Sequence, residues 1–466
     1  MNIRDEIVAR RIKRIENLGH EMGAGVPETR QVPLVSFARQ PFLICEMKRR
    51  SPSKGDIAAG ADPVTQAGNY RAAGAQSISI LTEEEYFGGS LNDLMAVKKA
   101  YPETAILRKD FLVDVEDIDV SFRAGADAVL LIASMLEKQL FGTMLSRVRE
   151  LGMAALVELH SQEDAEKVSS FKPKLVGINS RDLETFKLDP VIPFKTKRFI
   201  TWPCEVVFES GIFCLEDAVT ALSSGFKGIL VGESVMRQPG LVGELLSAFD
   251  YTGSDFWGRL YSRYNNRPLV KICGITRRED ALKAIELGAD IVGFILAESP
   301  RKTTLEFIKS CADLPVLKAG VVVSGPDAEI DPEIKELLES GALDVIQFHG
   351  DEAPDACFVR AFPYYKTVRI QGAEEIETLK EFHCPRVLID AFSQSVRGGT
   401  GKEIPKELVE EARKIRPLWL AGGIGPENIA LIVENFSPEL VDVSSRLESE
   451  PGIKDHRKME KFFRKL

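Results

Sequence analysis

Short apolar runs, each followed by a segment long enough for a helix, recur through the first half of this 466-residue chain. Continuous apolar runs that alternate with helical segments are typical of parallel strands buried on both faces. Eight such units in about 250 residues is the number found in a closed (βα)8 barrel. The predicted strands are 42–46, 77–81, 105–108, 128–132, 154–158, 175–179, 205–209 and 228–232.

The same pattern then starts again. Its strands are predicted at 269–273, 291–295, 316–323, 345–349, 364–368, 387–390, 418–421 and 440–443. One open sheet is the competing architecture, but sheets rarely exceed about 10 strands. We therefore predict an α/β protein of two consecutive (βα)8 TIM barrels, the first with an N-terminal helical extension.

The segment between the two sets, 251–267, is polar and aromatic. We place the domain boundary near Tyr264 and predict a first barrel at 1–256, a linker at 257–267 and a second barrel at 268–466.

Composition argues against several classes of protein. The net charge of −10 argues against nucleic-acid binding, which usually requires a basic stripe. No apolar stretch approaches about 20 residues, and residues 1–25 lack the continuous apolar core of a secretory signal. The seven cysteines form no C-x-x-C pair. We therefore expect a cytoplasmic protein with reduced thiols and with no membrane or nucleic-acid partner. We also expect a monomer, because each barrel of a fused pair can be stabilised by the other.

Polar side chains stand at the ends of the predicted strands of the first half, where barrel enzymes place their active sites. One such residue is as easily a solvated charge, but the same pattern at six strand ends predicts a shared site. The groups are Glu46 and Lys48, Lys109, Glu158, Asn179 with Arg181, Glu209-Ser210-Gly211, and Gly232-Glu233-Ser234. The small residues after the last two strands are typical of a phosphate site, because glycine uncovers backbone N–H groups.

The second half has an equivalent set. A cysteine, Cys273, ends its first strand, where it is either a core residue or a reactive thiol. Asp390 ends the sixth strand, and His349 ends the fourth, where we favour a structural role. Glycines in 398–402 and 421–423 have the pattern of a phosphate cradle.

The strand-end motifs of the first half, EMKRRSPSKG (46–55), LRKDF (107–111), VGINSRD (176–182) and ESG (209–211), resemble indole-3-glycerol phosphate synthase over about 7–249. The resemblance implies closure of an indole ring from 1-(2-carboxyphenylamino)-1-deoxyribulose 5-phosphate, with loss of CO2 and water. Lys109 would protonate the C2 carbonyl oxygen, with Glu158 as its acid–base counterpart. The other implied site residues are Glu46, Lys48, Asn179 and Arg181 for the anthranilate, Ser51, Gly211, Gly232 and Ser234 for the phosphate, Phe111 and Leu131 for the aromatic ring, and Glu209 and Ser210 for further substrate contacts.

The second half resembles phosphoribosylanthranilate isomerase through KICGIT (271–276), SPR (299–301), QFHG (347–350), LID (388–390), AGG (421–423) and DVSSRLE (442–448). That family opens a ribose ring and moves a proton from C2, an Amadori rearrangement. The resemblance implies Cys273 as the base, Asp390 as the acid and Arg301 as the contact of the carboxylate. The phosphate would be held by Gly399, Gly401, Gly422, Gly423 and Ser444.

Two alternatives stay open at this point. A histidine-pathway pair of phosphosugar barrels would be expected to have aspartates at strands 1 and 5, where this chain has Glu46, Cys273 and Glu158. A non-catalytic barrel scaffold would be expected to have lost competent side chains, and these are retained. Neither half has a nicotinamide fingerprint or a metal-ligand cluster, so we expect no cofactor. Lys271, with Arg301, is predicted to keep the Cys273 thiol reactive.

Overall fold

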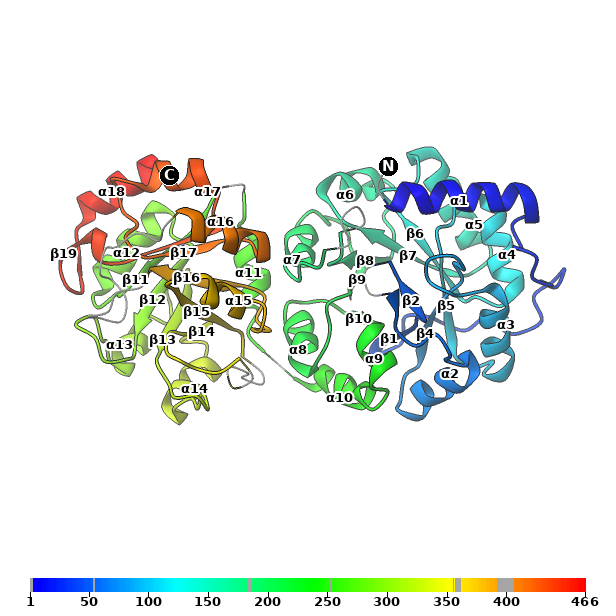
Figure 1. Ribbon diagram of the computed structural model, residues 1–466, viewed down its shortest axis with the longest axis horizontal. Helices are drawn as coiled ribbons and strands as arrows, with labels where there is room; N and C mark the ends of the chain where they lie inside the picture. The colour runs from blue at the N-terminus through cyan, green and yellow to red at the C-terminus, as the bar shows by residue number, and fades with distance from the viewer. Residues whose placement is uncertain are drawn as a thin grey trace. The chain divides into compact units, whose positions relative to one another are not determined.

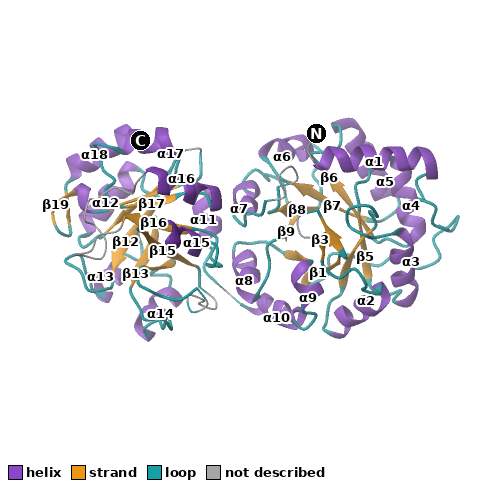
Figure 2. Ribbon diagram, in the orientation of Figure 1, coloured by secondary structure: helices purple, strands orange, loops and turns teal. Residues whose placement is uncertain are grey.

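A computed structural model describes residues 3–52, 55–182, 187–251, 253–265, 267–354, 356, 362–391 and 406–466. The chain divides into two compact units, Met1–Thr252 and Gly253–Leu466. In each unit the strands form a central barrel and the helices surround it (Figure 2). Both predicted (βα)8 barrels are therefore confirmed.

The barrel of the first unit closes between its first and last strands, and every neighbouring pair is parallel. All eight predicted strands are present, and they are labelled in Figure 1. They are β1 Phe42–Met47, β4 Ser77–Leu81, β5 Ala105–Lys109, β6 Ala128–Ile132, β7 Ala154–Leu159, β8 Leu175–Asn179, β9 Glu205–Glu209 and β10 Gly228–Val231. A short hairpin, β2 Arg50–Ser51 and β3 Gly55–Asp56, follows β1.

Helices follow the strands along the chain, and an N-terminal helix precedes them, as predicted. They are α1 Ile3–Leu18, α2 Pro63–Ala72, α3 Leu91–Ala100, α4 Val115–Ala124, α5 Lys138–Glu150, α6 Gln162–Ser169, α7 Ile192–Lys197, α8 Leu215–Ser223, α9 Glu233–Arg237, α10 Leu241–Ser247 and the 3-10 turn η1 Ala248–Asp250. Local sequence sets their ends. In α4, Asp114 and Asp117 form a capping box, and Gly125 ends the helix at φ 102°.

The interior of the first barrel is apolar up to the level of the strand ends. Its core includes Ile44, Leu107 and Leu156. Each lies two residues before a charged residue on the same strand, and side chains two apart point to the same side. The strands therefore carry Glu46, Lys109 and Glu158 inward, above an apolar floor.

Helix α1 is held to the carboxyl end of this barrel by a buried arginine. The Arg11 guanidinium donates to Asp110 and to Asp117, each at 2.9 Å. All three side chains are at most 4% exposed. Burial alone would raise the pKa of Asp110, but Arg11 and Arg108 lower it below its ordinary value. Asp110 directly follows Lys109, so this helix supports the strand end that carries the predicted acid.

Replacing Arg11 by Met should destabilise the first barrel. Removing one partner of a buried ion pair leaves uncompensated charge, which costs about 3 kcal/mol of unfolding free energy. Urea unfolding of the two chains measures this difference. Arg10→Met is the matched control, because Arg10 is 54% exposed and pairs only at the surface with Glu6 and Glu85. An equal effect of both substitutions would contradict the assignment.

The pH dependence of that stability follows from the lowered carboxyl pKa values of Asp110 and Asp117. Carboxyl groups whose folded pKa is depressed stabilise the fold above their unfolded pKa, and the contribution is lost as the pH falls through the folded value. The difference between wild type and Arg11→Met should therefore shrink on acidification below about pH 4.

The second barrel repeats the architecture and closes between β11 and β18. Its eight predicted strands are also confirmed. They are β11 Leu269–Cys273, β12 Ile291–Ile295, β13 Leu317–Val322, β14 Val345–Phe348, β15 Tyr364–Ile370, β16 Val387–Ala391, β17 Trp419–Ala421 and β18 Leu440–Val443.

The helices of the second unit are α11 Phe256–Ser262, α12 Arg278–Leu287, α13 Leu305–Ser310, α14 Pro332–Glu339, α15 Ala373–Thr378, α16 Lys406–Ile415, α17 Ile429–Phe436 and α18 His456–Lys465. The 3-10 turn η2 Ser445–Leu447 and a hairpin, β19 Glu448–Glu450 and β20 Ile453–Lys454, follow the last barrel strand.

The segment predicted as a linker contains helix α11, which is packed against the second barrel. The Trp257 ring lies 5.8 Å from the Trp419 ring of β17. The Tyr261 hydroxyl donates to Glu439 at 2.7 Å, and Arg259 pairs with Asp344. Trp257 and Tyr261, two aromatic residues that made the sequence of this segment look like a linker, are buried. The segment therefore belongs to the second compact unit.

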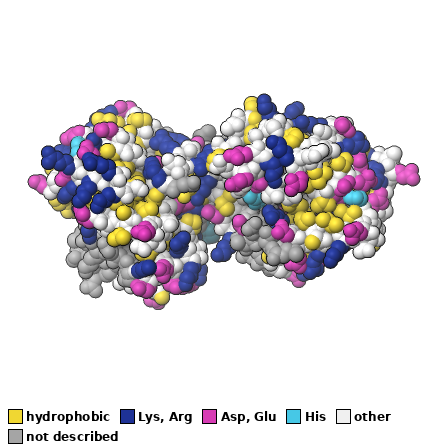
Figure 3. Space-filling view, turned by 90° about the horizontal axis from the view of Figure 1, so that it is seen from above, with side chains coloured by type: hydrophobic (Ala, Val, Ile, Leu, Met, Phe, Trp, Pro, Cys, Tyr) yellow, Lys and Arg dark blue, Asp and Glu magenta, His cyan; other side chains and the backbone are white. Residues whose placement is uncertain are grey.

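The described surface of the second unit carries charged side chains of both signs. Among the helices that the structure describes, none is both long and apolar enough to cross a membrane. Lys and Arg side chains gather at the end of the second unit where α18 lies (Figure 3). Acidic partners are interspersed there, as in the pairs Lys461–Glu427 and Lys283–Glu460. The described cysteines are all free thiols.

Candidate active sites

A cavity opens at the carboxyl ends of the strands of the first barrel. It brings together residues from strands and loops that are far apart in the sequence. Those of the predicted set that line it are Glu46, Lys48, Ser51, Lys109, Phe111, Glu158, Asn179, Arg181, Glu209 and Ser210. A small adjoining recess, which shares Glu46, Lys48, Arg181 and Ser210 with it, is lined by the predicted phosphate residues Gly211, Gly232 and Ser234.

Lys109 is the centre of this cavity. Its Nζ lies 2.8 Å from Glu158 Oε2 and 3.2 Å from Glu209 Oε2. Burial alone would lower the pKa of Lys109, but the two carboxylates raise it above its ordinary value. The side chain therefore carries its proton at neutral pH, as a proton donor must.

The two carboxylates beside Lys109 differ in their protonation. Burial favours the neutral form of both, but Lys109 and His160 lower the pKa of Glu158 well below its ordinary value. Burial raises the pKa of Glu209, and the neighbouring Glu158 charge adds to this effect. Like charges this close cannot both ionise freely. The site thus holds an ionised Glu158, a proton-bearing Glu209 and an ammonium together.

A second lysine, Lys48, follows β1 and lines the same cavity. Lys48 Nζ lies 2.8 Å from Glu46 Oε1, and Glu46 is 3% exposed. Arg181 lines both the main cavity and the recess. Ser234 Oγ donates to the Ile212 carbonyl at 2.8 Å, which holds the loop after β9 against the start of α9.

Leu131 was predicted to line the aromatic slot, and this prediction is wrong. It is fully buried and does not contact the cavity, whereas its neighbours Leu130 and Ile132 do. Successive side chains of a strand point to opposite faces, so residues 130 and 132 face inward and 131 faces the helices. Phe111, the other predicted slot residue, does line the cavity.

His160 was not predicted. Its Nε2 lies 3.3 Å from Glu158 Oε1, the oxygen that does not contact Lys109, and its backbone N–H donates to Asp164. Its position two residues after Glu158 on the same strand end was the available signal.

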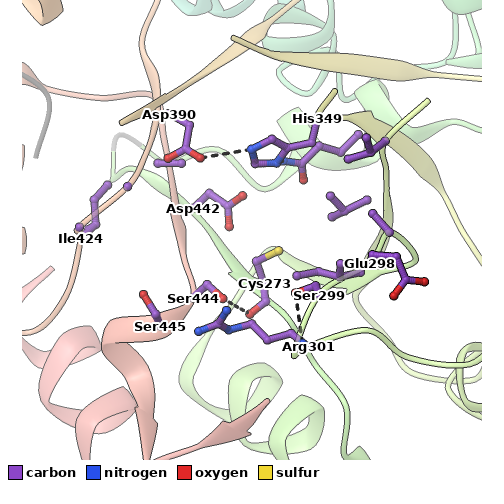
Figure 4. A pocket seen from close by; sticks show the side chains of 18 residues that line it. Cys273, Glu298, Ser299, Arg301, His349, Asp390, Ile424, Asp442, Ser444 and Ser445 are labelled. Atoms are coloured by element: carbon purple, nitrogen blue, oxygen red, sulfur yellow. Dashed lines mark hydrogen bonds and ion pairs between the residues drawn. The ribbon is translucent and has the colours of Figure 1, made fainter. Parts of the chain in front are cut away.

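A larger cavity, of about 450 Å³, opens at the carboxyl end of the second barrel (Figure 4). Six predicted residues line it: Cys273, Arg301, Asp390, Gly422, Gly423 and Ser444. Gly399 and Gly401 lie outside the described residues. The predicted base, Cys273, and the predicted acid, Asp390, therefore line the same cavity.

Cys273 lies beside a buried lysine, as predicted. A Cβ atom built on Gly293, the β12 partner of Cys273, would lie 2.9 Å from both Cys273 Sγ and Lys271 Nζ. Only glycine leaves room for both side chains at this point. Burial raises the pKa of Cys273, and the Lys271 ammonium offsets part of that rise. Arg301 was also predicted to lower the pKa of Cys273. Its guanidinium instead binds the Glu448 carboxylate, and it is not among the main causes of the pKa shift of Cys273.

Asp390 is paired with the histidine to which the sequence assigned a structural role. His349 Nε2 lies 3.2 Å from Asp390 Oδ2, and both residues line the cavity (Figure 4). Gln347, whose amide oxygen accepts from the Tyr365 hydroxyl at 2.9 Å, lies next to this pair. His349 is therefore a residue of the site.

Arg301 and the predicted phosphate residues Gly422, Gly423 and Ser444 also line this cavity. Arg301 Nε and Nη2 contact the Glu448 carboxylate at 2.9 and 2.8 Å. Gly422 and Gly423 have φ values of 87° and 66°, a conformation that turns successive N–H groups outward. Ser444 Oγ donates to the Cys273 carbonyl at 3.1 Å, which links the cradle to the strand of the predicted base.

Among the described residues that line the two cavities, none form a metal-ligand group. Within the described part of the chain, no three His, Cys, Asp or Glu residues are grouped to hold a metal ion.

Two family models match the chain in succession. One is described as indole-3-glycerol phosphate synthase and matches residues 4–245, and the other is described as N-(5'phosphoribosyl)anthranilate (PRA) isomerase and matches residues 270–465.

Individual proteins match over both halves or over one. A multifunctional tryptophan biosynthesis protein of Phycomyces blakesleeanus is 30% identical over 91% of this chain and 62% of its own length. A tryptophan biosynthesis protein of Phytophthora nicotianae is 30% identical over 86% of this chain and 87% of its own length. An indole-3-glycerol phosphate synthase of Geobacillus kaustophilus is 40% identical over 50% of this chain and 92% of its own length. The chain thus spans about three fifths of the Phycomyces protein.

Proposed function

Because the chain belongs to the indole-3-glycerol phosphate synthase family and carries a phosphoribosylanthranilate isomerase domain after it, we propose that it catalyses two consecutive steps of tryptophan biosynthesis. The second barrel would isomerise N-(5-phosphoribosyl)anthranilate to 1-(2-carboxyphenylamino)-1-deoxyribulose 5-phosphate. The first barrel would close that product to indole-3-glycerol phosphate. The observation that carries the proposal is that each cavity holds a proton donor and a proton acceptor beside a recess built of small residues.

In the first barrel, Lys109 would donate its proton to the C2 carbonyl oxygen as the aromatic ring attacks C2. Its ammonium, held between Glu158 and Glu209, supports this role. Glu158 would accept the proton released in the later steps, because it rests ionised in the cavity. CO2 leaves from the ring carbon that attacked C2, and water leaves from C2, which restores the aromatic system.

The remaining residues of this site would bind and orient the substrate. Lys48 and Arg181 supply positive charge for the anthranilate carboxylate, with Glu46 and Asn179 beside them. Phe111, Leu130 and Ile132 form the apolar wall for the ring. The recess of Gly211, Gly232 and Ser234 suits the phosphate, since backbone N–H groups and a hydroxyl are available there.

In the second barrel, Asp390 would protonate the ring oxygen and Cys273 would remove the C2 proton. Gly422, Gly423 and Ser444 would bind the phosphate, and Arg301 the carboxylate. His349, beside Asp390, would orient that carboxyl group. A monomeric state and a cytoplasmic location remain predictions from the sequence.

A coupled assay tests the proposal directly. The purified chain, supplied with phosphoribosylanthranilate alone, should form indole-3-glycerol phosphate in amounts equal to the substrate consumed. Accumulation of the deoxyribulose phosphate would show that only the isomerase works. No consumption beyond spontaneous hydrolysis would overturn both assignments.

Both activities should be independent of divalent metals. Lys109 and Asp390 can supply the protons, so no Lewis acid is required for either step. Rates before and after exhaustive chelation should agree within error. A loss that Mg²⁺ or Zn²⁺ restores would contradict the prediction.

A further inference from the structure

Asp442 is a charged residue of the second cavity that the two assigned roles, base and acid, do not use. It stands on β18, where it pairs in register with Lys271 of β11. Lys271 Nζ lies 2.6 Å from Asp442 Oδ2, and the lysine side chain is fully buried. The Lys271 ammonium therefore contacts one of the two oxygens of the Asp442 carboxyl group, and it is a charge-assisted donor to that oxygen.

The second carboxylate oxygen has a different environment. Asp442 is 7% exposed and lines the cavity, yet its Oδ1 is buried and accepts no hydrogen bond from any residue that the structure describes. A buried carboxylate oxygen without a donor is costly, and such an oxygen at a cavity wall calls for a donor from the ligand.

The position of Asp442 relative to the other two groups indicates which donor that is. In Figure 4 the Asp442 carboxylate lies between Asp390 and Cys273. If Asp390 faces the ring oxygen and Cys273 faces the C2 hydrogen, the group between them faces the hydroxyl on C2. A hydroxyl is a donor that fits a carboxylate oxygen.

We propose that Asp442 is a third acid–base residue of the isomerase site and takes the proton of the C2 hydroxyl as the enol becomes the ketone. The inference rests on the isomerase function proposed above and adds a step to it. Removal of the C2 hydrogen leaves an enol, and a ketone forms only when the C2 hydroxyl also loses its proton.

The protons balance without any further reactant. Asp390 gives its proton to the ring oxygen as the C1–O bond breaks and the nitrogen lone pair forms a C1–N double bond. The Cys273 thiolate takes the C2 proton, the C2–H electron pair forms the C1–C2 double bond, and the C1–N double-bond pair returns to nitrogen. The C2 O–H bond then breaks: its proton passes to Asp442 Oδ1, and its electron pair forms the C2 carbonyl. The C1–C2 double-bond pair takes the proton from the Cys273 thiol at C1. Return of one proton from Asp442 to Asp390, which lines the same cavity, restores the starting state.

Hydrogen exchange into the product isolates this step. In D2O, the reverse reaction replaces one C1 hydrogen of 1-(2-carboxyphenylamino)-1-deoxyribulose 5-phosphate with deuterium, and it needs a base at C1 and an acid at the C2 oxygen. The full chain carrying Lys109→Ala is the parent, because it should not consume this compound by ring closure. The loss of the corresponding C1 signal is followed by NMR.

Asp442→Asn in this parent should slow the exchange by about 100-fold, the scale of one general acid–base group. Cys273→Ser should slow it as well. Asp390→Asn should lose net isomerisation but keep the exchange, because ring opening is not part of that half-reaction. Exchange by Asp442→Asn close to the parent rate would overturn the proposal, and so would an equal loss in Asp390→Asn.

Binding of the product to each variant separates chemistry from folding. Asp442→Asn should bind it with a Kd close to that of the parent. If that chain does not fold, Asp442→Glu decides, because it keeps a carboxylate for Lys271 but displaces its oxygen, which should slow exchange about tenfold or more. A parent-like rate in Asp442→Glu would then overturn the role. A parent that neither isomerises nor exchanges would instead refute the proposed isomerase function.

Discussion

Replacing Lys109 by Ala should reduce ring closure about 1,000-fold and leave isomerisation near the wild-type rate. The loss follows because the Lys109 ammonium, held 2.8 Å from Glu158, would be the proton donor to the substrate carbonyl. Isomerisation should survive because Cys273 and Asp390 belong to a separate unit with its own core. Separate assays of the two steps, each with its own substrate, measure the effect.

Lys99→Ala is the matched control for this experiment. Lys99 lies in the same barrel on α3, is exposed and lines neither described cavity. It should leave both rates unchanged. Because the Ala variant leaves Glu158 and Glu209 without their shared cation, thermal unfolding should be recorded beside the rates. Equal loss of both activities in a folded Lys109→Ala chain would mean that one site serves both steps, contrary to the two-site assignment.

Replacing Cys273 by Ser should lower isomerase turnover about 100-fold or more, since a hydroxyl is a far weaker base than a thiol. Ring closure should be unaffected. Because burial raises the pKa of Cys273 and Lys271 offsets only part of the rise, the thiolate fraction grows across and above neutral pH. The wild-type isomerase rate should therefore still be rising over pH 6 to about 9, where an ordinary thiol titrates.

Cys311→Ser is the matched control, because Cys311 is a fully buried thiol of the same barrel that does not line the cavity. It makes the same chemical change and should cost stability without the loss of catalysis. A Cys273→Ser chain with isomerase turnover within a fewfold of wild type would show that this thiol is only a core residue.

The sixteen barrel strands could be predicted because a parallel strand buried on both faces has a continuous apolar sequence. That same continuity explains the error at Leu131. An uninterrupted apolar run has no alternation that distinguishes the inward face from the outward one, so Leu130 could not be told from Leu131. Only the phase of β6 in the closed barrel places Leu130 at the cavity.

Helix α11 shows a second feature that could not be predicted from the sequence. Its polar and aromatic sequence resembles that of a connecting segment, and no local signal reveals what Trp257 packs against. The rings of Trp257 and Trp419 are 162 positions apart in the sequence and meet only in the folded barrel. Long-range contacts of this kind depend on the whole topology, whereas helix caps such as Asp114 depend on a few neighbouring residues.

The sequence by itself determined the fold class, the number of barrels and the residues at the strand ends, because periodicity and strand-end position are local properties of the chain. The tertiary structure decided the charges and partners of those residues. Ion pairs form between Lys109 and Glu158, Lys109 and Glu209, Arg301 and Glu448, and Lys271 and Asp442. All but the first of these pairs join residues that are 100 or more positions apart in the sequence. Protonation and reactivity depend on burial and on charges within a few ångströms, and these are set only when the barrel closes.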